Sequence, residues 1–327
     1  MNRRRFLLTS LAGALAAPLA AEGQQAGNVV RVGLLRPAPP SPEVARVLDA
    51  FKQGLGQHGY SEGRNLAVEF RFPKGKADRL SDIAAELIRL KPHAILAAAS
   101  SGVDAVRKAT TIIPIVALDL ETDPLATGIV ASLARPGGNV TGIFLDFPEL
   151  GGKWLQLVKE VVPQTARVAL LWDPGTGRVP LGGAETAAPS LGLRLHVFEA
   201  RGPNDFEAVF RSAIVARAGA MVILSSPVFN TYRRQLVDLS SRHRLPAIMP
   251  FPLFVEDGGL IAYGPDLIEL YKQGGTMVGR ILRGAKPGDL PIERPSRFVL
   301  AVNTRTAKAL GLAIPPSLLA RADQVIE

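Results

Sequence analysis

Two serines, Ser100 and Ser101, stand where a short apolar run at residues 94–98 ends and an amphipathic stretch begins. If a strand ends and a helix starts there, their hydroxyls and the free N–H groups of the first helical turn can bind a carboxylate or another anion. The same placement also suits a serine nucleophile, which requires a histidine base held in a loop, normally later in the chain. The four histidines are His58, His93, His196 and His243. Two precede the serines and the others fall in a strand-like run and at a helix end, so the pattern favours anion binding over hydrolysis.

Carboxylates follow two other apolar runs. Asp119 and Asp173 come directly after residues 113–118 and 168–172, where they could receive an ammonium or a hydroxyl group of a ligand. Ser226, just beyond residues 220–224, adds another hydroxyl. A simpler interpretation of the serines is helix capping, and Asp173 followed by Pro and Gly also fits a plain turn.

Aromatic side chains are placed at similar positions in a chain with only 6% aromatic residues. Phe229, Phe251, Phe254 and Tyr263 all follow or end apolar runs, and they could form an apolar or stacking wall beside a ligand. The alternative for Phe251 is a place in the core. We expect Phe251 and Tyr263 to contact the ligand, with the serines at its polar or anionic end and the aspartates at its cationic or hydroxyl end.

Motifs for metals and cofactors are missing from the sequence. There is no cysteine, no histidine pair has metal-ligand spacing, and no phosphate-binding P-loop sequence occurs. Gly54, Gly56 and Gly59 match a dinucleotide-binding string, but they end a helical stretch instead of starting one. We therefore expect no cofactor, no metal and no catalytic residue.

The elements that must position these side chains alternate between strand and helix. Apolar runs without polar alternation suit strands buried on both faces of a parallel sheet; they occupy residues 30–35, 66–70, 94–98, 113–118, 140–144, 168–172, 193–198, 220–224, 247–249 and 260–263. Helical patterns lie between them at residues 43–57, 76–90, 103–109, 150–161, 204–216 and 232–242, and a later one spans residues 267–282. Asn204 is expected to cap its helix.

Two consecutive series of this kind predict an α/β protein with two doubly wound parallel-sheet lobes joined by a hinge. We assign residues 29–144 plus about 264–290 to the first lobe, and residues 145–263 plus about 291–327 to the second. Ligands bind beyond the carboxyl ends of the strands in such sheets. The candidate side chains all follow strands, so they should meet in the cleft between the lobes.

The first 21 residues have the pattern of an export signal, with Arg3, Arg4 and Arg5 followed by an apolar stretch and an alanine-rich end. The arginines and the Phe-Leu pair after them resemble a twin-arginine signal, and the general secretory route is the open alternative. The apolar part is shorter than the ~20 residues of a membrane span. We expect cleavage, no lipid anchor on a chain without cysteine, and a periplasmic location. The formal charge of +9 falls to +6 without the three leader arginines, and its spread along the chain indicates a solvated basic surface, not a nucleic-acid site.

Several stretches together carry a family resemblance. They are residues 59–65, 78–80, 112–116, 123–142, 243–247, 254–260, 263–265, 307–312 and 314–316. In this order they resemble the substrate-binding proteins of ABC transporters with the type I periplasmic-binding-protein fold, in the branch that includes tryptophan and aromatic amino-acid binders. Two features depart from the family pattern: Ser100-Ser101-Gly102 replaces a common Thr-Pro pair, and Glu121 adds a charge near the cleft where relatives often have a small residue.

The resemblance implies two lobes that close over a ligand and dock onto a membrane permease, without catalysis. We expect a monomer that binds a small polar or zwitterionic molecule, amino-acid-like in character, for an ABC importer. The expected ligand contacts are Ser100, Ser101, Asp119, Asp173, Ser226, Phe251 and Tyr263. Two alternatives stay open: a ligand-sensing module for a membrane receptor, which uptake by a deletion strain would distinguish, and an exported hydrolase that uses Ser100.

Overall fold

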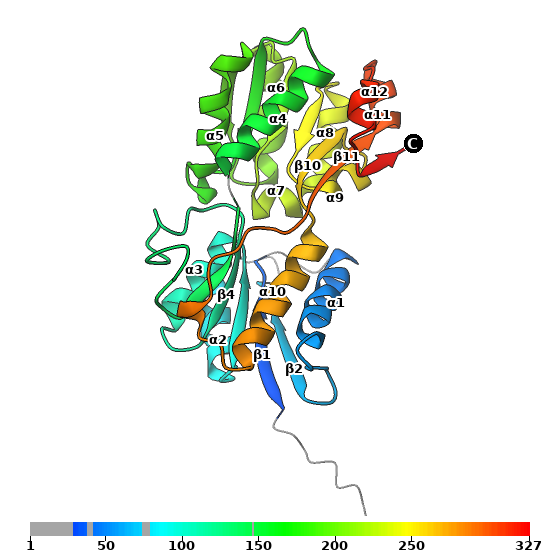
Figure 1. Ribbon diagram of the computed structural model, residues 1–327. Helices are drawn as coiled ribbons and strands as arrows, with labels where there is room; N and C mark the ends of the chain where they lie inside the picture. The colour runs from blue at the N-terminus through cyan, green and yellow to red at the C-terminus, as the bar shows by residue number, and fades with distance from the viewer. Residues whose placement is uncertain (1–28, 38–41, 74–78, 146) are drawn as a thin grey trace, which may run out of the picture.

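The computed structural model describes residues 29–37, 42–73, 79–145 and 147–327. They form two α/β lobes placed one above the other, each built around its own sheet (Figure 1). The predicted fold class is confirmed. The predicted leader, residues 1–21, lies outside the described residues.

The first lobe contains a five-stranded, fully parallel sheet with the order β2-β1-β3-β4-β5. Its strands are β1 (Val30–Leu35), β2 (Leu66–Arg71), β3 (Ala94–Ala98), β4 (Ile115–Asp119) and β5 (Val140–Phe144). Both faces of this sheet are apolar. Alternate strand residues such as Leu34 and Leu96 join one buried cluster, whereas Leu35 and Ile95 join another. The strands therefore read as continuous apolar runs because helices cover both sides.

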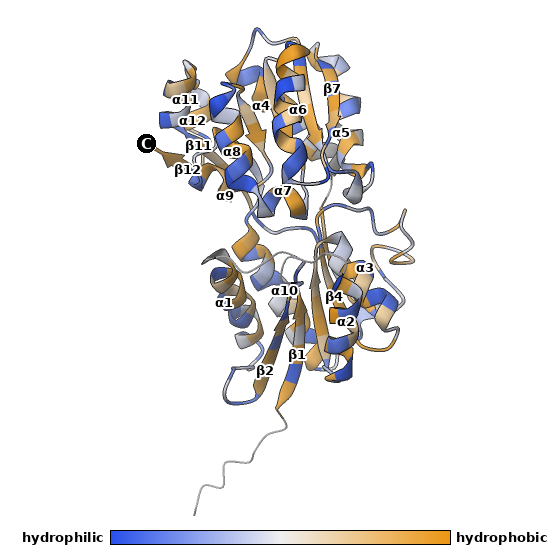
Figure 2. Cartoon of the chain, turned by 180° about the vertical axis from the view of Figure 1, so that it is seen from behind, coloured by the Kyte–Doolittle hydropathy of each residue, from blue (hydrophilic) through white to orange (hydrophobic). Residues whose placement is uncertain are grey.

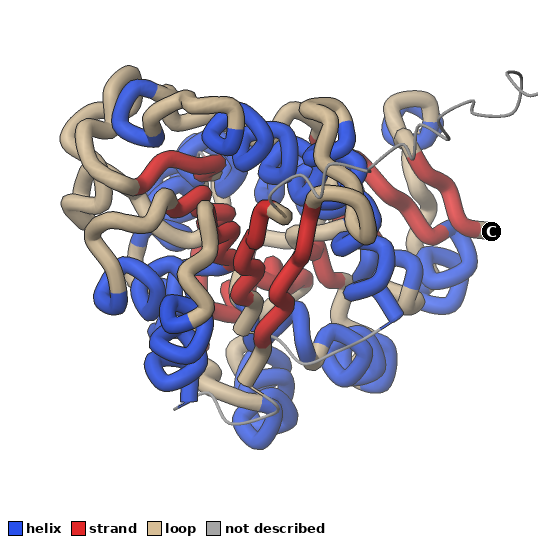
Figure 3. Tube along the Cα trace, turned by 90° about the horizontal axis from the view of Figure 1, so that it is seen from below, coloured by secondary structure: helices blue, strands red, loops and turns tan. Residues whose placement is uncertain are grey.

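Four helices cover these faces: α1 (Pro42–Gly56) and α10 (Leu267–Leu282) on one side, α2 (Leu80–Arg89) and α3 (Ala99–Ala109) on the other. Figure 3 shows strands lying between helices on both sides. Helix α10 returns to this lobe from far along the chain and packs on α1 through glycines. A Cβ on Gly54 would lie 2.1 Å from the Lys272 carbonyl oxygen, and one on Gly275 would lie 2.1 Å from that of Phe51. Only glycine permits this approach.

The second lobe contains a seven-stranded sheet with the order β12-β11-β10-β9-β8-β6-β7. Its strands are β6 (Arg167–Trp172), β7 (Arg194–Glu199), β8 (Ala220–Ile223), β9 (Ala247–Met249), β10 (Ile261–Pro265), β11 (Phe298–Asn303) and β12 (Gln324–Ile326). β10 and β11 pair antiparallel and the other neighbours pair parallel. The longer helices are α4 (Phe147–Val161), α5 (Val179–Ala187), α6 (Pro203–Val215) and α8 (Arg233–Arg242). Hydrophobic and hydrophilic residues alternate along these helices (Figure 2). Leu155, Phe206 and Leu236 from three of them belong to the buried apolar cluster.

Shorter elements complete the lobes. They are α7 (Pro227–Thr231), α9 (Pro252–Glu256), α11 (Thr304–Leu310), α12 (Pro316–Leu319) and the 3-10 turns Pro174–Thr176, Pro189–Leu191 and Pro287–Asp289. One predicted cap is wrong: α6 begins at Pro203 with Gly202 as its N-cap, so Asn204 lies inside the first turn. Proline fits the first helical position because its missing N–H has no partner to lose there.

The chain passes between the lobes three times, after β5, between β10 and α10, and along the segment before β11 (Figure 1). That last segment bonds to both lobes. The Phe144 amide donates to the Glu293 carbonyl oxygen at 3.0 Å, and the Asp266 amide donates to that of Arg297 at 3.0 Å. Trp154 of α4 adds an indole N–H bond of 2.7 Å to the carbonyl oxygen of Tyr263 in β10. Neighbouring crossovers of this kind form the hinge that a cleft protein needs.

None of the helices in the described part of the chain is long and apolar enough to cross a membrane.

Candidate ligand-binding site

Two adjoining cavities lie where the carboxyl ends of the two sheets face each other. The inner cavity and the solvent space at its mouth together amount to about 520 Å³. It is lined from the first lobe, from α10 and from the second lobe by Arg36, Pro37, Ala98, Ala99, Leu118, Leu120, Glu121, Leu267, Leu270, Tyr271, Ser226, Pro227, Asn230 and Phe251. The outer cavity lies beside it and amounts to about 1370 Å³ together with the solvent space at its mouth. Pro37 and Pro227 line both cavities.

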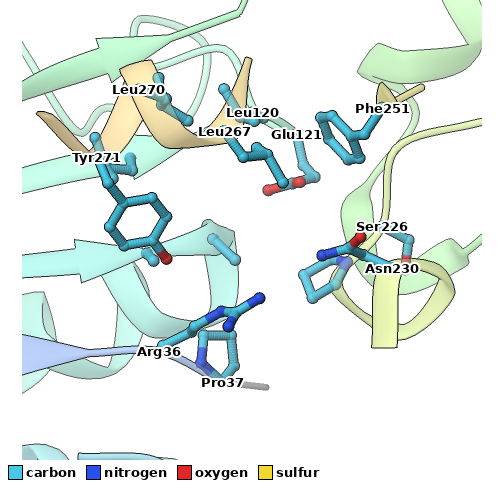
Figure 4. A pocket seen from close by; sticks show the side chains of 14 residues that line it. Arg36, Pro37, Leu120, Glu121, Ser226, Asn230, Phe251, Leu267, Leu270 and Tyr271 are labelled. Atoms are coloured by element: carbon cyan, nitrogen blue, oxygen red, sulfur yellow. The ribbon is translucent and has the colours of Figure 1, made fainter. Parts of the chain in front are cut away.

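Arg36 supplies the positive charge of the inner cavity. It directly follows β1, and its amide donates to the Arg71 carbonyl oxygen at 3.1 Å, which extends the β1–β2 pairing by one residue. The residue is only 7% exposed. Its guanidinium points into the cavity, between Tyr271 and Asn230 (Figure 4). A buried guanidinium offers several N–H donors in a planar fork that matches a carboxylate.

Glu121 supplies a carboxyl group at the same cavity, from the loop after β4. The Ser225 hydroxyl of the second lobe donates to its Oε1 at 3.0 Å. The Ser100 amide of the first lobe donates to its Oε2 at 3.3 Å. Burial and the neighbouring Asp119 carboxylate raise the pKa of Glu121 to about 8, although these hydrogen bonds oppose the shift. Glu121 therefore bonds to both lobes, and its raised pKa favours the neutral carboxyl group at pH 7.

Asp119, a predicted ligand contact, does not line either cavity. The residue is fully buried, and burial raises the pKa of its carboxyl group. Its oxygens accept from the amides of Glu121 and Thr122 at 3.0 and 3.1 Å, and from the Thr122 hydroxyl at 2.5 Å. The prediction that Asp119 lies at a strand end is confirmed. Its carboxylate oxygens, however, bond to the turn that contains Glu121 and do not face the cavity.

Ser100 and Ser101 lie in the first turn of α3 and line the outer cavity, not the inner one. The turn is made by Ala99, whose φ of +62° is rarely adopted by a residue with a side chain. This conformation lets the chain bend sharply from β3 into α3 and aims the Ser100 amide at Glu121. Backbone strain of this kind often accompanies a binding site.

Asp173 and Ser226 form a buried pair in the second lobe. The Ser226 hydroxyl donates to Asp173 Oδ2 at 2.6 Å, and the Gly175 amide donates to Oδ1 at 2.8 Å. The Ser226 oxygen also accepts from the Val228 amide at 3.0 Å, so it caps α7. Asp173 lines the outer cavity and Ser226 the inner one. Both predicted residues border the cleft, and they also fix the start of α7, the helix that carries Asn230.

The predicted aromatic wall is present only in part. Phe251 lines the inner cavity, but Phe229 and Phe254 are fully buried in the core, where Phe229 packs edge-on against Phe206. Tyr263 lines neither cavity. Its ring stacks on that of Phe298, with 6.0 Å between the ring centres, and the Lys153 ammonium lies 5.8 Å from the centre of the Tyr263 ring.

Among the residues that line the inner cavity, the sequence predicted only Ser226 and Phe251 as ligand contacts. The residues missed as contacts include the charged Arg36 and Glu121, and also Leu267, Leu270 and Tyr271 of α10 and Asn230 of α7. The α10 residues recur at helical spacing, which looks the same for a core contact and a cleft contact. Asn230 lies in α7, four residues beyond Ser226. Its Oδ1 is buried and has no hydrogen-bond partner among the described residues, so it offers an acceptor to a ligand.

The four histidines lie away from both cavities. His93 bonds the Arg31 amide at the start of β1, and His243 bonds Glu207 at 3.0 Å. His58 packs against Gly279 of α10, and His196 is in strand β7. Ser100 therefore has no imidazole beside it that could act as a base. Over residues 29–37, 42–73, 79–145 and 147–327, no cluster of three or more His, Asp or Glu side chains could hold a metal ion.

The sequence matches the family described as ABC transporter substrate binding protein over residues 41–326. The chain belongs to this family. The predicted resemblance to these substrate-binding proteins is confirmed.

Individual relatives are similar to the chain in sequence or in fold. A curated "Tyrosine-binding protein" of Clostridioides difficile is 25% identical to this ABC transporter substrate-binding protein over 283 residues, which cover 83% of this chain and 78% of the relative. A solved ABC domain in complex with L-Trp from Streptococcus pneumoniae has a TM-score of 0.83 at 22% identity and covers 91% of this chain and 100% of its own. A conserved domain protein of Vibrio cholerae has the same TM-score and coverage at 24% identity. These structures share the fold of the two lobes.

Proposed function

We propose that this chain is the periplasmic solute-binding component of an ABC importer, and that it closes its two lobes over an amino-acid-like ligand with an apolar or aromatic side chain. The observation that carries the proposal is the inner cavity, whose walls come from both lobes and combine one buried arginine with leucine and aromatic side chains. A closed cleft would then present a matched surface to a membrane permease. The export-signal pattern and the absence of cysteine support a freely diffusing periplasmic protein.

Each part of the ligand has a counterpart in the cavity. Arg36 matches a carboxylate, since its guanidinium points into the cavity and is shielded from water. Leu118, Leu270 and Phe251 provide an apolar surface for the side chain, and Tyr271 offers an aromatic ring with a hydroxyl. The relatives named for tyrosine and found with L-Trp bind molecules of this class.

Thermal unfolding of the mature protein with candidate solutes tests this proposal. We expect L-phenylalanine, L-tyrosine or L-tryptophan to stabilise the protein, by roughly 2.7 kcal/mol at 100 times the dissociation constant. Glucose and galactose serve as controls, because the inner cavity offers them mostly apolar walls. Stabilisation by the sugars alone, or by none of these amino acids, would contradict the proposed ligand class. Loss of uptake of the bound amino acid in a deletion strain would support the importer role over a sensor.

A further inference from the structure

Glu121 is the one carboxyl group that lines the inner cavity in the described part of the chain. It lies on a loop that Asp119 holds in place, and it is tied to both lobes through the Ser225 hydroxyl and the Ser100 amide. Its oxygens accept these two bonds, and the backbone of Leu120 also bonds to the carboxyl group. An ionised carboxylate has about four acceptor positions, so Glu121 can accept further donors from a molecule in the cavity.

The other polar atoms around the cavity suit a zwitterion. Arg36 provides donors on the first lobe, whereas the buried Oδ1 of Asn230 on the second lobe is an acceptor without a partner among the described residues. Asp119 cannot take the role of Glu121, because its oxygens already hold the Glu121 turn and are sealed from the cavity.

We propose that Glu121 is the acceptor for the cationic nitrogen of the ligand, and that binding of this ammonium group displaces one proton from the Glu121 carboxyl to the solvent. The inference rests on the proposed function, since it needs a ligand in the inner cavity. Glu121 would then select an amino acid over the corresponding carboxylic acid that lacks the amine.

The proton balance follows from the charges that surround Glu121. In the empty cleft, burial and the charge of Asp119 favour its neutral form, and Asp104 adds negative potential near Asp119. Asp173 borders the outer cavity, and Arg36 is the cation that lines the inner one. Helix α10 contributes only uncharged side chains to the lining. An ammonium group brings the positive charge that stabilises the carboxylate, so the neutral carboxyl loses its proton as the ion pair forms.

Three compounds with the same ring separate the two charges: L-phenylalanine, phenethylamine without the carboxylate, and 3-phenylpropionate without the amine. Titration calorimetry would compare the wild type with Glu121→Gln, which keeps the shape of the side chain. We expect the substitution to weaken binding of L-phenylalanine and phenethylamine roughly 30-fold or more. Binding of 3-phenylpropionate should stay the same or improve. Glu185→Gln, at an exposed glutamate of α5, is the matched control and should change nothing.

Proton release distinguishes this role from a structural one. Calorimetry at pH 6.5 in buffers with different ionisation enthalpies should give close to one proton released per L-phenylalanine bound by the wild type, and none by Glu121→Gln. Because the bound form holds fewer protons, affinity should rise with pH, by up to tenfold per unit, and level off near pH 8. Equal affinity of both variants for L-phenylalanine, or binding without proton release, would overturn the inference while the proposed function stands.

The ligand-free protein gives an independent readout. The pKa of Glu121 is raised above its ordinary value of 4.5 by folding, so its stabilising effect is present at low pH and is lost as pH rises toward 8. The unfolding constant of the wild type should rise by up to tenfold per pH unit between pH 5 and 8, relative to Glu121→Gln. Parallel pH profiles would overturn the titration of Glu121. If none of the three compounds binds the wild type, the proposed ligand class fails and the inference fails with it.

Discussion

Replacing Arg36 with glutamine is expected to weaken binding of L-phenylalanine roughly 30-fold or more, because the substitution removes the cation that lines the inner cavity and leaves the ligand carboxylate buried without a counter-charge. The Arg36→Lys variant keeps the charge but loses the planar fork. Its affinity for L-phenylalanine should therefore lie between those of the wild type and Arg36→Gln. Titration calorimetry measures the affinity of the wild type and of both variants for L-phenylalanine.

Phenethylamine provides the control for this prediction, since it lacks the carboxylate. Its affinity should change by only a few-fold in Arg36→Gln, whereas in Glu121→Gln it should fall as strongly as that of L-phenylalanine. A loss of affinity that is equal for both compounds in Arg36→Gln would contradict carboxylate recognition and indicate that the arginine only holds the cleft together.

The second large effect concerns stability. Asp173→Ala should lower the free energy of unfolding by about 3 kcal/mol, because it removes the acceptor of two buried hydrogen bonds, one from Ser226 and one from Gly175. Asp173→Asn should cost less, about 1 kcal/mol, since its amide oxygen can still accept from Gly175. The Ser226 oxygen caps α7, so loosening it should also reduce ligand affinity through Asn230. Urea denaturation measures the stability change.

A double-mutant cycle with Ser226→Ala checks that the two side chains act as a pair. The single substitutions each break the 2.6 Å bond, so the double variant should lose clearly less stability than the two single losses added together. Additive losses would mean that Asp173 and Ser226 stabilise the loop independently.

Most strands were predictable because they are buried on both faces and read as unbroken apolar runs, such as β1 and β3. Helix α5 was not predicted. It contains Gly182 and Gly183, which look like helix breakers, and it forms because it packs closely on α4. A Cβ on Gly151 would lie 2.3 Å from the Ala184 amide nitrogen. Close packing of two distant segments overrides a weak local propensity.

The location of the candidate site could be predicted from the sequence, but most of the side chains that line it could not. The rule that ligands bind beyond the carboxyl ends of parallel strands led to loops that line the two cavities. It could not show which side chain in a loop faces the cavity: Asp119 turns inward to bond its own turn, and Glu121, two residues on, reaches the cavity. The contribution of α10 required knowing that this late helix packs on the first lobe.

Closure of the cleft on a bound amino acid is the central claim, and the distance between the lobes tests it most directly. Helices α3 and α6 both begin at the outer cavity, on opposite lobes. The chain has no native cysteine, so spin labels can be attached to cysteines introduced at the exposed positions Lys108 and Ser212. With saturating L-phenylalanine, the distance distribution should shift to shorter and narrower values, and Arg36→Gln should require a correspondingly higher concentration. An unchanged distribution at a concentration where calorimetry shows full binding would contradict the account.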